Sequence, residues 1–314
     1  MKHLLAGLAL ALVAAEGGSA QEPPTFSTES ELVVLHVAVR DRKGGYVGGL
    51  EQTSFRVLEN KLPQTITFFH SQDAPVTIGL LIDSSRSMGP NRELVIAAAM
   101  EFAKAMNPQD EFFVLGFNED LHVPLPSGDP FTHHEPTLRV ALVQAIKAEG
   151  QTAIYNAVDA GLKHVNKGAF ERQVLVVLSD GGDNASRITR EEVLSTAQGS
   201  NAVIYSIALV DPLDRDADPG FLSDLSRMTG GLAFRPQNAR EVARIFQQIA
   251  IDIRNMYTLG YVPSLPHEAV ERSRRSERLR QVAVEVRSPT GQKLAVRTRR
   301  AYLAGADEVE SDAR

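Results

Sequence analysis

The pattern of apolar and polar positions divides the chain into a central part that alternates strands and helices and two flanks that are rich in strands. Residues 76–82 are nearly all apolar without period-two alternation, which is typical of a strand covered on both faces of a parallel sheet. A second run of this kind spans residues 172–178, and residues 91–106 and 239–254 carry one apolar helical face. We therefore predict a doubly wound, mostly parallel α/β sheet, with helices on both faces, for residues 74–254.

The two flanks carry shorter strand patterns. Residues 21–73 form the N-terminal β segment, with predicted strands at 32–39, 55–58 and 65–69 and a turn over 59–63, and residues 255–304 form the C-terminal one, with strands at 281–286 and 293–299. Three strands are too few to close a sandwich alone. We expect the two segments to pair into one small β unit, with the α/β domain inserted between them. Residues 305–314 are charged and predict a flexible tail.

The first 20 residues resemble a cleavable signal peptide. A charged start, an apolar run at residues 4–15 and small residues up to Ala20 predict export, with cleavage after Ala20, to the periplasm or the outside of the cell. The run is too short to span a bilayer, so no membrane insertion of the mature chain is expected, although an uncleaved anchor remains the alternative. The absence of cysteine excludes disulfides, thiolate metal sites and a cysteine-linked lipid.

Charge argues against a nucleic-acid partner. The formal net charge is -6, which gives no electrostatic attraction for phosphates. The one basic run, at residues 272–278, contains no aromatic side chain to stack on a base and is interpreted as a solvated loop.

Oxygen-bearing side chains follow the predicted strands. Asp83, Ser85 and Ser87 come directly after the first apolar run, and Asp180 comes after the second; Thr152 stands at the start of a predicted helix, where it is also a good N-cap. Singly, each of these residues is more often a turn former or a cap. Together they lie where the carboxyl ends of parallel strands gather ligands, and their oxygens suit a hard cation.

These residues carry a resemblance to a known family. D-x-S-x-S at residues 83–87, G-x-T-A around Thr152 and S-D-G around Asp180 resemble the metal-ion-dependent adhesion site of von Willebrand factor type A domains, over residues 74–254. The flanks resemble bacterial secreted proteins called VWFA-related. The resemblance implies Mg²⁺ or Mn²⁺ bound by Asp83, Ser85, Ser87, Thr152 and Asp180, with one position open to an Asp or Glu carboxylate of a protein or peptide ligand.

One position departs from the family pattern. Arg86 stands between the two serines, where members more often carry a small residue such as glycine. A cation there would weaken metal binding or attract an acidic partner.

Other candidate metal sites have weaker support in the sequence. The acidic loop at residues 214–220 lacks the glutamate of a calcium loop, and His133 and His134 have no matching third ligand. Asp183 and Asn184 could shape the rim of the site or cap the next helix, and we favour the cap; Thr189 and Glu192 could also cap that helix as a capping box.

The sequence favours binding over catalysis. Neither G-x-S-x-G nor a P-loop is present, and no catalytic base is evident beside Ser85 or Ser87. We expect an exported, non-enzymatic module that captures a ligand carboxylate through a divalent cation. Two alternatives stay open: a scaffold subunit of a cell-envelope assembly, and a magnesium-dependent hydrolase.

Overall fold

The computed structural model describes residues 32–71, 74–147, 149–210, 216–264 and 278–304. The predictions of a signal peptide and of a C-terminal tail lie outside these residues, as does most of the basic run. Among the described residues, no helix has both the length and the apolar character needed to cross a membrane.

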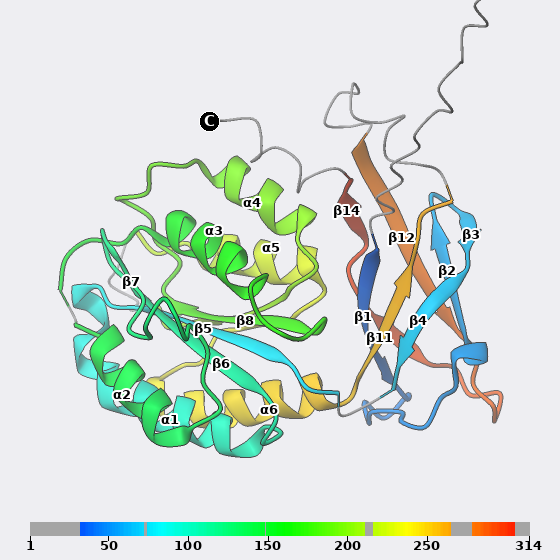
Figure 1. Ribbon diagram of the computed structural model, residues 1–314, viewed down its shortest axis with the longest axis horizontal. Coiled ribbons are helices and arrows are strands. Elements are labelled where there is room, and N and C mark those ends of the chain that lie inside the picture. Colours follow the sequence, from blue (N-terminus) through cyan, green and yellow to red (C-terminus); the bar gives the residue numbers. More distant parts are fainter. Residues whose placement is uncertain (1–31, 72–73, 148, 211–215, 265–277, 305–314) are drawn as a thin grey trace, which may run out of the picture. The chain divides into compact units, whose positions relative to one another are not determined.

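A six-stranded sheet forms the centre of the α/β domain (Figure 1). Its order is β10-β9-β8-β5-β6-β7, and every neighbouring pair is parallel except β6 with the edge strand β7. The central strand β5 is buried along its whole length, as its continuous apolar run predicts. The strands are β5 (Thr77–Asp83), β6 (Glu111–Phe117), β7 (Leu121–His122), β8 (Gln173–Ser179), β9 (Val203–Ala208) and β10 (Ala233–Phe234).

Helices cover both faces of this sheet. Figure 1 shows α1, α2 and α6 on one face and α3, α4 and α5 on the other. On α6 the buried Ile245, Ile249 and Ile253 recur every four residues, so one stripe of the helix faces the core. The predicted fold class is confirmed. The helices are α1 (Arg92–Ala105), α2 (Glu135–Ala145), α3 (Ile154–Val165), α4 (Arg190–Gly199), α5 (Pro219–Thr229) and α6 (Val242–Arg254).

The flanks form a β unit of two four-stranded antiparallel sheets, ordered β13-β1-β11-β4 and β14-β12-β2-β3. Each sheet takes strands from both flanks, which confirms that the flanks pair with each other around the α/β domain. Leu35, Val57, Tyr257 and Val282, drawn from both sheets, lie in one apolar core. The strands are β1 (Val33–Arg40), β2 (Phe55–Glu59), β3 (Leu62–Gln64), β4 (Ile66–His70), β11 (Met256–Tyr261), β12 (Leu279–Val286), β13 (Ala295–Arg297) and β14 (Ala301–Leu303).

Two predictions for the β unit are wrong. The turn predicted over residues 59–63 spans only Asn60 and Lys61, whose φ angles of 47° and 70° allow a tight two-residue hairpin, so Leu62 already belongs to β3. The single strand predicted at 293–299 is instead β13, after which the chain crosses to the other sheet and forms the unexpected β14.

The β unit contacts the amide ends of the central strands. The Arg172 guanidinium, just before β8, donates to the carbonyl of Met256 at 2.9 Å and to Thr258 Oγ1 at 3.1 Å. Arg299 donates to the carbonyl of Ser200, which lies before β9, at 2.8 Å. The carboxyl ends of the strands, where Asp83 and Asp180 lie, are therefore at the opposite end of the sheet from the β unit.

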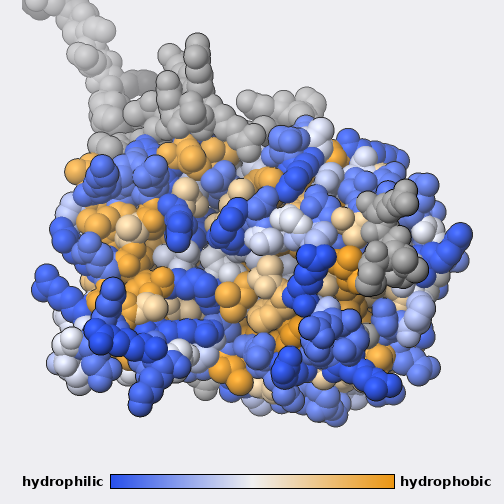
Figure 2. Space-filling view, turned by 180° about the vertical axis from the view of Figure 1, so that it is seen from behind, coloured by the Kyte–Doolittle hydropathy of each residue, from blue (hydrophilic) through white to orange (hydrophobic). Residues whose placement is uncertain are grey.

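The surface is mostly hydrophilic. Figure 2 shows apolar patches scattered among polar side chains on the face opposite to that of Figure 1. Val140, Val143 and Ile251 are among the exposed large apolar residues, and they belong to the outer sides of α2 and α6.

Candidate metal centre

Asp83 ends the central strand β5 and anchors the candidate site. Its side chain is fully buried, and both carboxylate oxygens accept hydrogen bonds: Oδ1 from the Ser85 backbone N–H at 2.8 Å and Oδ2 from Ser179 Oγ at 2.7 Å. The first bond turns the chain after the strand, and the second ties this turn to the end of the neighbouring strand β8. Asp83 thus positions Ser85 and Ser87.

Ser85, Ser87 and Asp180 form a chain of contacts beside Asp83. The Ser85 and Ser87 hydroxyl oxygens lie 3.0 Å apart, and Ser87 Oγ donates to Asp180 Oδ2 at 3.3 Å. The other Asp180 oxygen, Oδ1, accepts the Gly182 N–H at 2.9 Å, which aims this carboxylate at the serines. The structure therefore brings four of the five predicted residues together.

Thr152 lies on the adjacent loop, outside this chain of contacts. Its N–H donates to Asn184 Oδ1 at 2.9 Å, and its carbonyl accepts the backbone N–H groups of Asn184 at 2.9 Å and Ala185 at 3.1 Å. The prediction that Thr152 caps α3 is wrong: Ala153 occupies the N-cap position, because the loop from β8 already holds the Thr152 backbone. Within the described residues Thr152 Oγ1 makes no hydrogen bond, so this hydroxyl is available to a ligand.

The prediction for Asp183 and Asn184 is also wrong. They do not cap the next helix, α4, whose capping box of Thr189 and Glu192 is confirmed. Asp183 Oδ1 instead accepts the Tyr155 N–H at 3.4 Å, at the start of the preceding helix, α3. Both residues therefore join the loop after β8 to the start of α3.

Three supporting residues escaped the sequence reasoning. Ser179 is the serine of the S-D-G motif, directly before Asp180, and its place in this motif could have indicated its contact with the site. Ser84 Oγ accepts the Lys147 N–H at 2.6 Å, and Glu119 accepts the Gln151 N–H at 2.5 Å. These last two bonds fix the loop that carries Thr152, but they join segments far apart in sequence and leave no local pattern.

The other metal-capable residues have structural roles. Asp218 caps α5 by accepting the Phe221 N–H at 2.9 Å, and His134 occupies the N-cap position of α2. Within the described residues, no three His, Cys, Asp or Glu side chains gather as a metal site, so a metal centre needs the hydroxyl groups as donors.

The geometry of the serines fits a small divalent cation. Neighbouring ligand oxygens around octahedral Mg²⁺, with bonds of about 2.0–2.1 Å, lie about 2.9 Å apart. The separations of 3.0 Å between the hydroxyl oxygens and 3.3 Å between Ser87 Oγ and Asp180 Oδ2 are close to this value. The donor set of hydroxyls and carboxylates is also one that Mg²⁺ and Mn²⁺ accept.

The electrostatic environment of Asp83 also favours a bound cation. Burial raises the pKa of Asp83 to about 6, and the nearby Asp180 carboxylate adds to this effect, whereas the hydrogen bonds from Ser179 and Ser85 lower the pKa. Among the described residues, no cationic side chain forms an ion pair with Asp83. A buried carboxylate without a counter-charge is costly, and a bound divalent cation would supply that charge.

Comparison with known proteins identifies the family. The model of the von Willebrand factor type A domain matches residues 77–248, more than half of the chain. The chain belongs to the von Willebrand factor type A (VWA) family. The comparison with curated proteins gives no match.

Solved structures similar to this VWA protein include a von Willebrand factor type A protein from Catenulispora acidiphila. It is 12% identical, with 88% of this chain and 75% of that chain covered and a TM-score of 0.50, and at this identity it bears on the fold alone. The others include an aerotolerance-related membrane protein from Bacteroides fragilis (14% identity, 56% and 98% covered, TM-score 0.45). A further one is the vWF domain of a type V pili tip protein from Porphyromonas gingivalis (12% identity, 58% and 95% covered, TM-score 0.46).

In this VWA domain the unusual Arg86 is exposed. It stands between Ser85 and Ser87 and is the first residue of a short 3-10 helix, Arg86–Asn91. Its side chain is therefore in contact with solvent, whereas the neighbouring Ser85 is buried.

Proposed function

We propose that the VWA domain binds Mg²⁺ or Mn²⁺ through Asp83, Ser85, Ser87, Thr152 and Asp180, and thereby captures an Asp or Glu carboxylate of a protein ligand. One observation carries this proposal: two hydroxyls and a carboxylate lie at the separations of ligand oxygens, next to the buried and uncompensated Asp83.

Each residue has a defined part in this proposal. Ser85 and Ser87 offer neutral hydroxyls, so the carboxylates of Asp83 and Asp180 supply all of the negative charge. Asp83 also holds the loop in place through the Ser85 N–H, and Thr152 offers the hydroxyl that has no other hydrogen bond among the described residues. When bound, the cation supplies a Lewis-acidic centre for an external carboxylate.

The site supports binding better than catalysis. Within the described part of the chain, neither His nor Lys forms a hydrogen bond with the Ser85 or Ser87 hydroxyl, so a general base of the usual kind for a serine nucleophile is missing there. We therefore propose an adhesion-type, non-enzymatic role. The signal-like sequence of residues 1–20 supports placing this role outside the cytoplasm.

The position of the site suits capture of a large ligand. The β unit contacts the amide ends of β8 and β9, whereas Asp83, Ser85, Ser87 and Asp180 lie at the carboxyl ends of β5 and β8. A protein ligand can approach the metal end without meeting the β unit.

Calorimetric titration of Mg²⁺ and Mn²⁺ into the chelator-treated protein tests the metal. We expect saturable binding in the wild type and its loss in Asp83→Ala and in the double variant Ser85→Ala with Ser87→Ala. Ser288→Ala with Thr290→Ala is the matched control, because these two hydroxyls are also two residues apart and 3.0 Å from each other but lie in an exposed turn of the β unit.

Binding of metal by the control but by neither site variant would support the proposal. Equal binding by all variants would refute the site, and no binding by the wild type would refute metal dependence. A glutamate-containing peptide whose binding requires Mn²⁺ would then support capture of a carboxylate.

A further inference from the structure

The chain that follows β12 in the β unit forms two short strands, β13 and β14, which belong to different sheets. β13 pairs with β1, with Ala38 opposite Arg297, whereas β14 pairs with β12, with Gln281 opposite Ala301. Residues 298–300 cross between the two sheets. Because β14 begins at Ala301, the described residues provide no strand partner for the second half of β12 on this side.

Among the described residues, no backbone hydrogen bond reaches β12 from the β14 side beyond Val282. Val282 donates its N–H to the Arg300 carbonyl at 2.8 Å, on the β14 side, whereas Gln281 accepts from Asn60 at 2.8 Å, on the β2 side. Backbone groups alternate in direction along a strand, so the N–H and carbonyl of Val284 point to the same side as those of Val282. Within the described part of the chain, the pairing with β14 does not extend to Val284. An open edge of this kind can pair with an added strand.

A cavity of about 600 Å³ lies at this open edge. Its lining combines apolar residues from both sheets with cationic residues. We call it the β12 groove and define it by Leu58, Lys61, Ala283, Val284, Val296 and Arg300.

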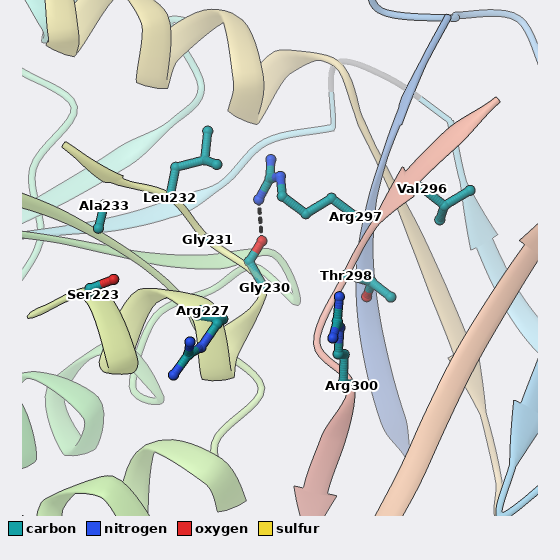
Figure 3. A pocket seen from close by; sticks show the side chains of 10 residues that line it. All are labelled: Ser223, Arg227, Gly230, Gly231, Leu232, Ala233, Val296, Arg297, Thr298 and Arg300. Atoms are coloured by element: carbon teal, nitrogen blue, oxygen red, sulfur yellow. Dashed lines mark hydrogen bonds between the residues drawn. The ribbon is translucent and has the colours of Figure 1, made fainter. Parts of the chain in front are cut away.

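A second cavity of about 360 Å³ adjoins the groove, and both share Val296, Thr298 and Arg300 (Figure 3). Figure 3 shows Arg300 on the crossing segment and Arg227 on α5, on opposite sides of this second cavity. Among the described residues, no acidic side chain lines either cavity. Because Arg227 forms an ion pair with Asp224 at 2.5 Å, the positive charge of the β12 groove rests on its own lining side chains, among them Lys61 and Arg300.

We propose that the β12 groove binds an extended acidic segment of a partner protein, which adds a short strand to β12 at Val284. Apolar side chains of the segment face the cavity, and its carboxylates face Arg300 and Lys61. The groove lies at the β-unit end of the molecule, opposite the metal centre, so it is a second interaction surface beyond the proposed function.

Fluorescence anisotropy with a labelled octapeptide of alternating glutamate and valine tests the groove. The titration uses the full chain in EDTA, so that no divalent cation can recruit the peptide to the metal centre. We expect saturable binding, weakened about tenfold in Arg300→Glu and in Lys61→Glu and weakened by added salt. Arg139→Glu, an exposed change on α2 with the same change of net charge, is expected to bind as the wild type does.

Two further peptides separate charge from strand pairing. An octapeptide of alternating lysine and valine, and a glutamate–valine peptide with alternate backbone nitrogens methylated, are both expected to lose binding. No saturable binding by the wild type, equal binding by Arg300→Glu, or equal binding of either control peptide would overturn the proposal. A concentration-dependent dimer that Arg300→Glu dissolves would assign the groove to a second copy and would also overturn it.

Discussion

His36 makes the stability of the protein depend on pH. It lies on β1 with 4% of its surface exposed, and its Nδ1 is 3.3 Å from Thr258 Oγ1. Burial, together with the positive charges of Arg172 and Arg299, lowers the pKa of His36 from 6.5 to about 3. The folded protein therefore keeps His36 neutral over a range in which the unfolded chain takes up a proton.

The size of this effect follows from the two pKa values. Because the folded pKa lies below the unfolded one, stability is fully present above about pH 6.5 and is lost as pH falls toward 3. At about pH 5, the unfolded state gains about 2 kcal/mol from protonation of this histidine, whereas at about pH 7.5 the gain is close to zero.

The variant His36→Asn removes the titrating group while keeping a polar side chain. Urea unfolding at about pH 7.5 and pH 5 measures the free energy of unfolding of both proteins. We expect the wild type to lose about 2 kcal/mol more than the variant between these pH values, because the carboxyl groups that also titrate are common to both. The exposed His70, changed to Asn, is the control and should leave the wild-type loss unaltered. Equal losses in wild type and His36→Asn would refute the reasoning.

Two further substitutions test the packing. Asp252 is fully buried on α6, where it accepts a hydrogen bond from Tyr205 Oη at 2.6 Å and pairs with the Arg297 guanidinium. Asp252→Ala should therefore lower the free energy of unfolding, measured in urea, by about 3–5 kcal/mol. A loss below about 1 kcal/mol would contradict a stabilising role of this ion pair. Gly116→Ala would place Cβ 2.1 Å from the Ala145 carbonyl oxygen and should lower the free energy of unfolding by about 1–3 kcal/mol. Gly128 has no neighbouring atom within 4 Å of such a Cβ, so Gly128→Ala should leave the stability unchanged. Equal melting temperatures of the two variants would contradict this prediction.

Local sequence patterns predicted most of the strands and helices, because the side-chain periodicity that forms them lies within each segment. The buried run of β5 and the four-residue stripe of α6 each follow from side-chain periodicity. The capping box of Thr189 and Glu192 spans three residues and formed as expected. The turn at Asn60 and Lys61 was placed too broadly, because periodicity marks the faces of a strand better than its ends.

The candidate site was predictable only in part. The Asp83 bond to the Ser85 N–H spans two residues and is built into the D-x-S-x-S motif. The roles of Thr152 and Asp183 were missed because their partners lie about 30 residues away, and short-range capping rules do not consider such partners.

By itself the sequence determined most of the strands and helices, which faces they bury, and which oxygen-bearing side chains follow the strands β5 and β8. Only the tertiary structure decided which segments meet. Ser87 reaches Asp180 across 93 residues, and β1 pairs with β11 across more than 200. It also decided that the chain after β12 changes sheets, so that the pairing of β14 with β12 ends before Val284. The physical reason is that the periodicity of a segment sets which face its side chains take. Which other segment that face packs against depends on contacts between distant residues, and the local pattern does not specify them.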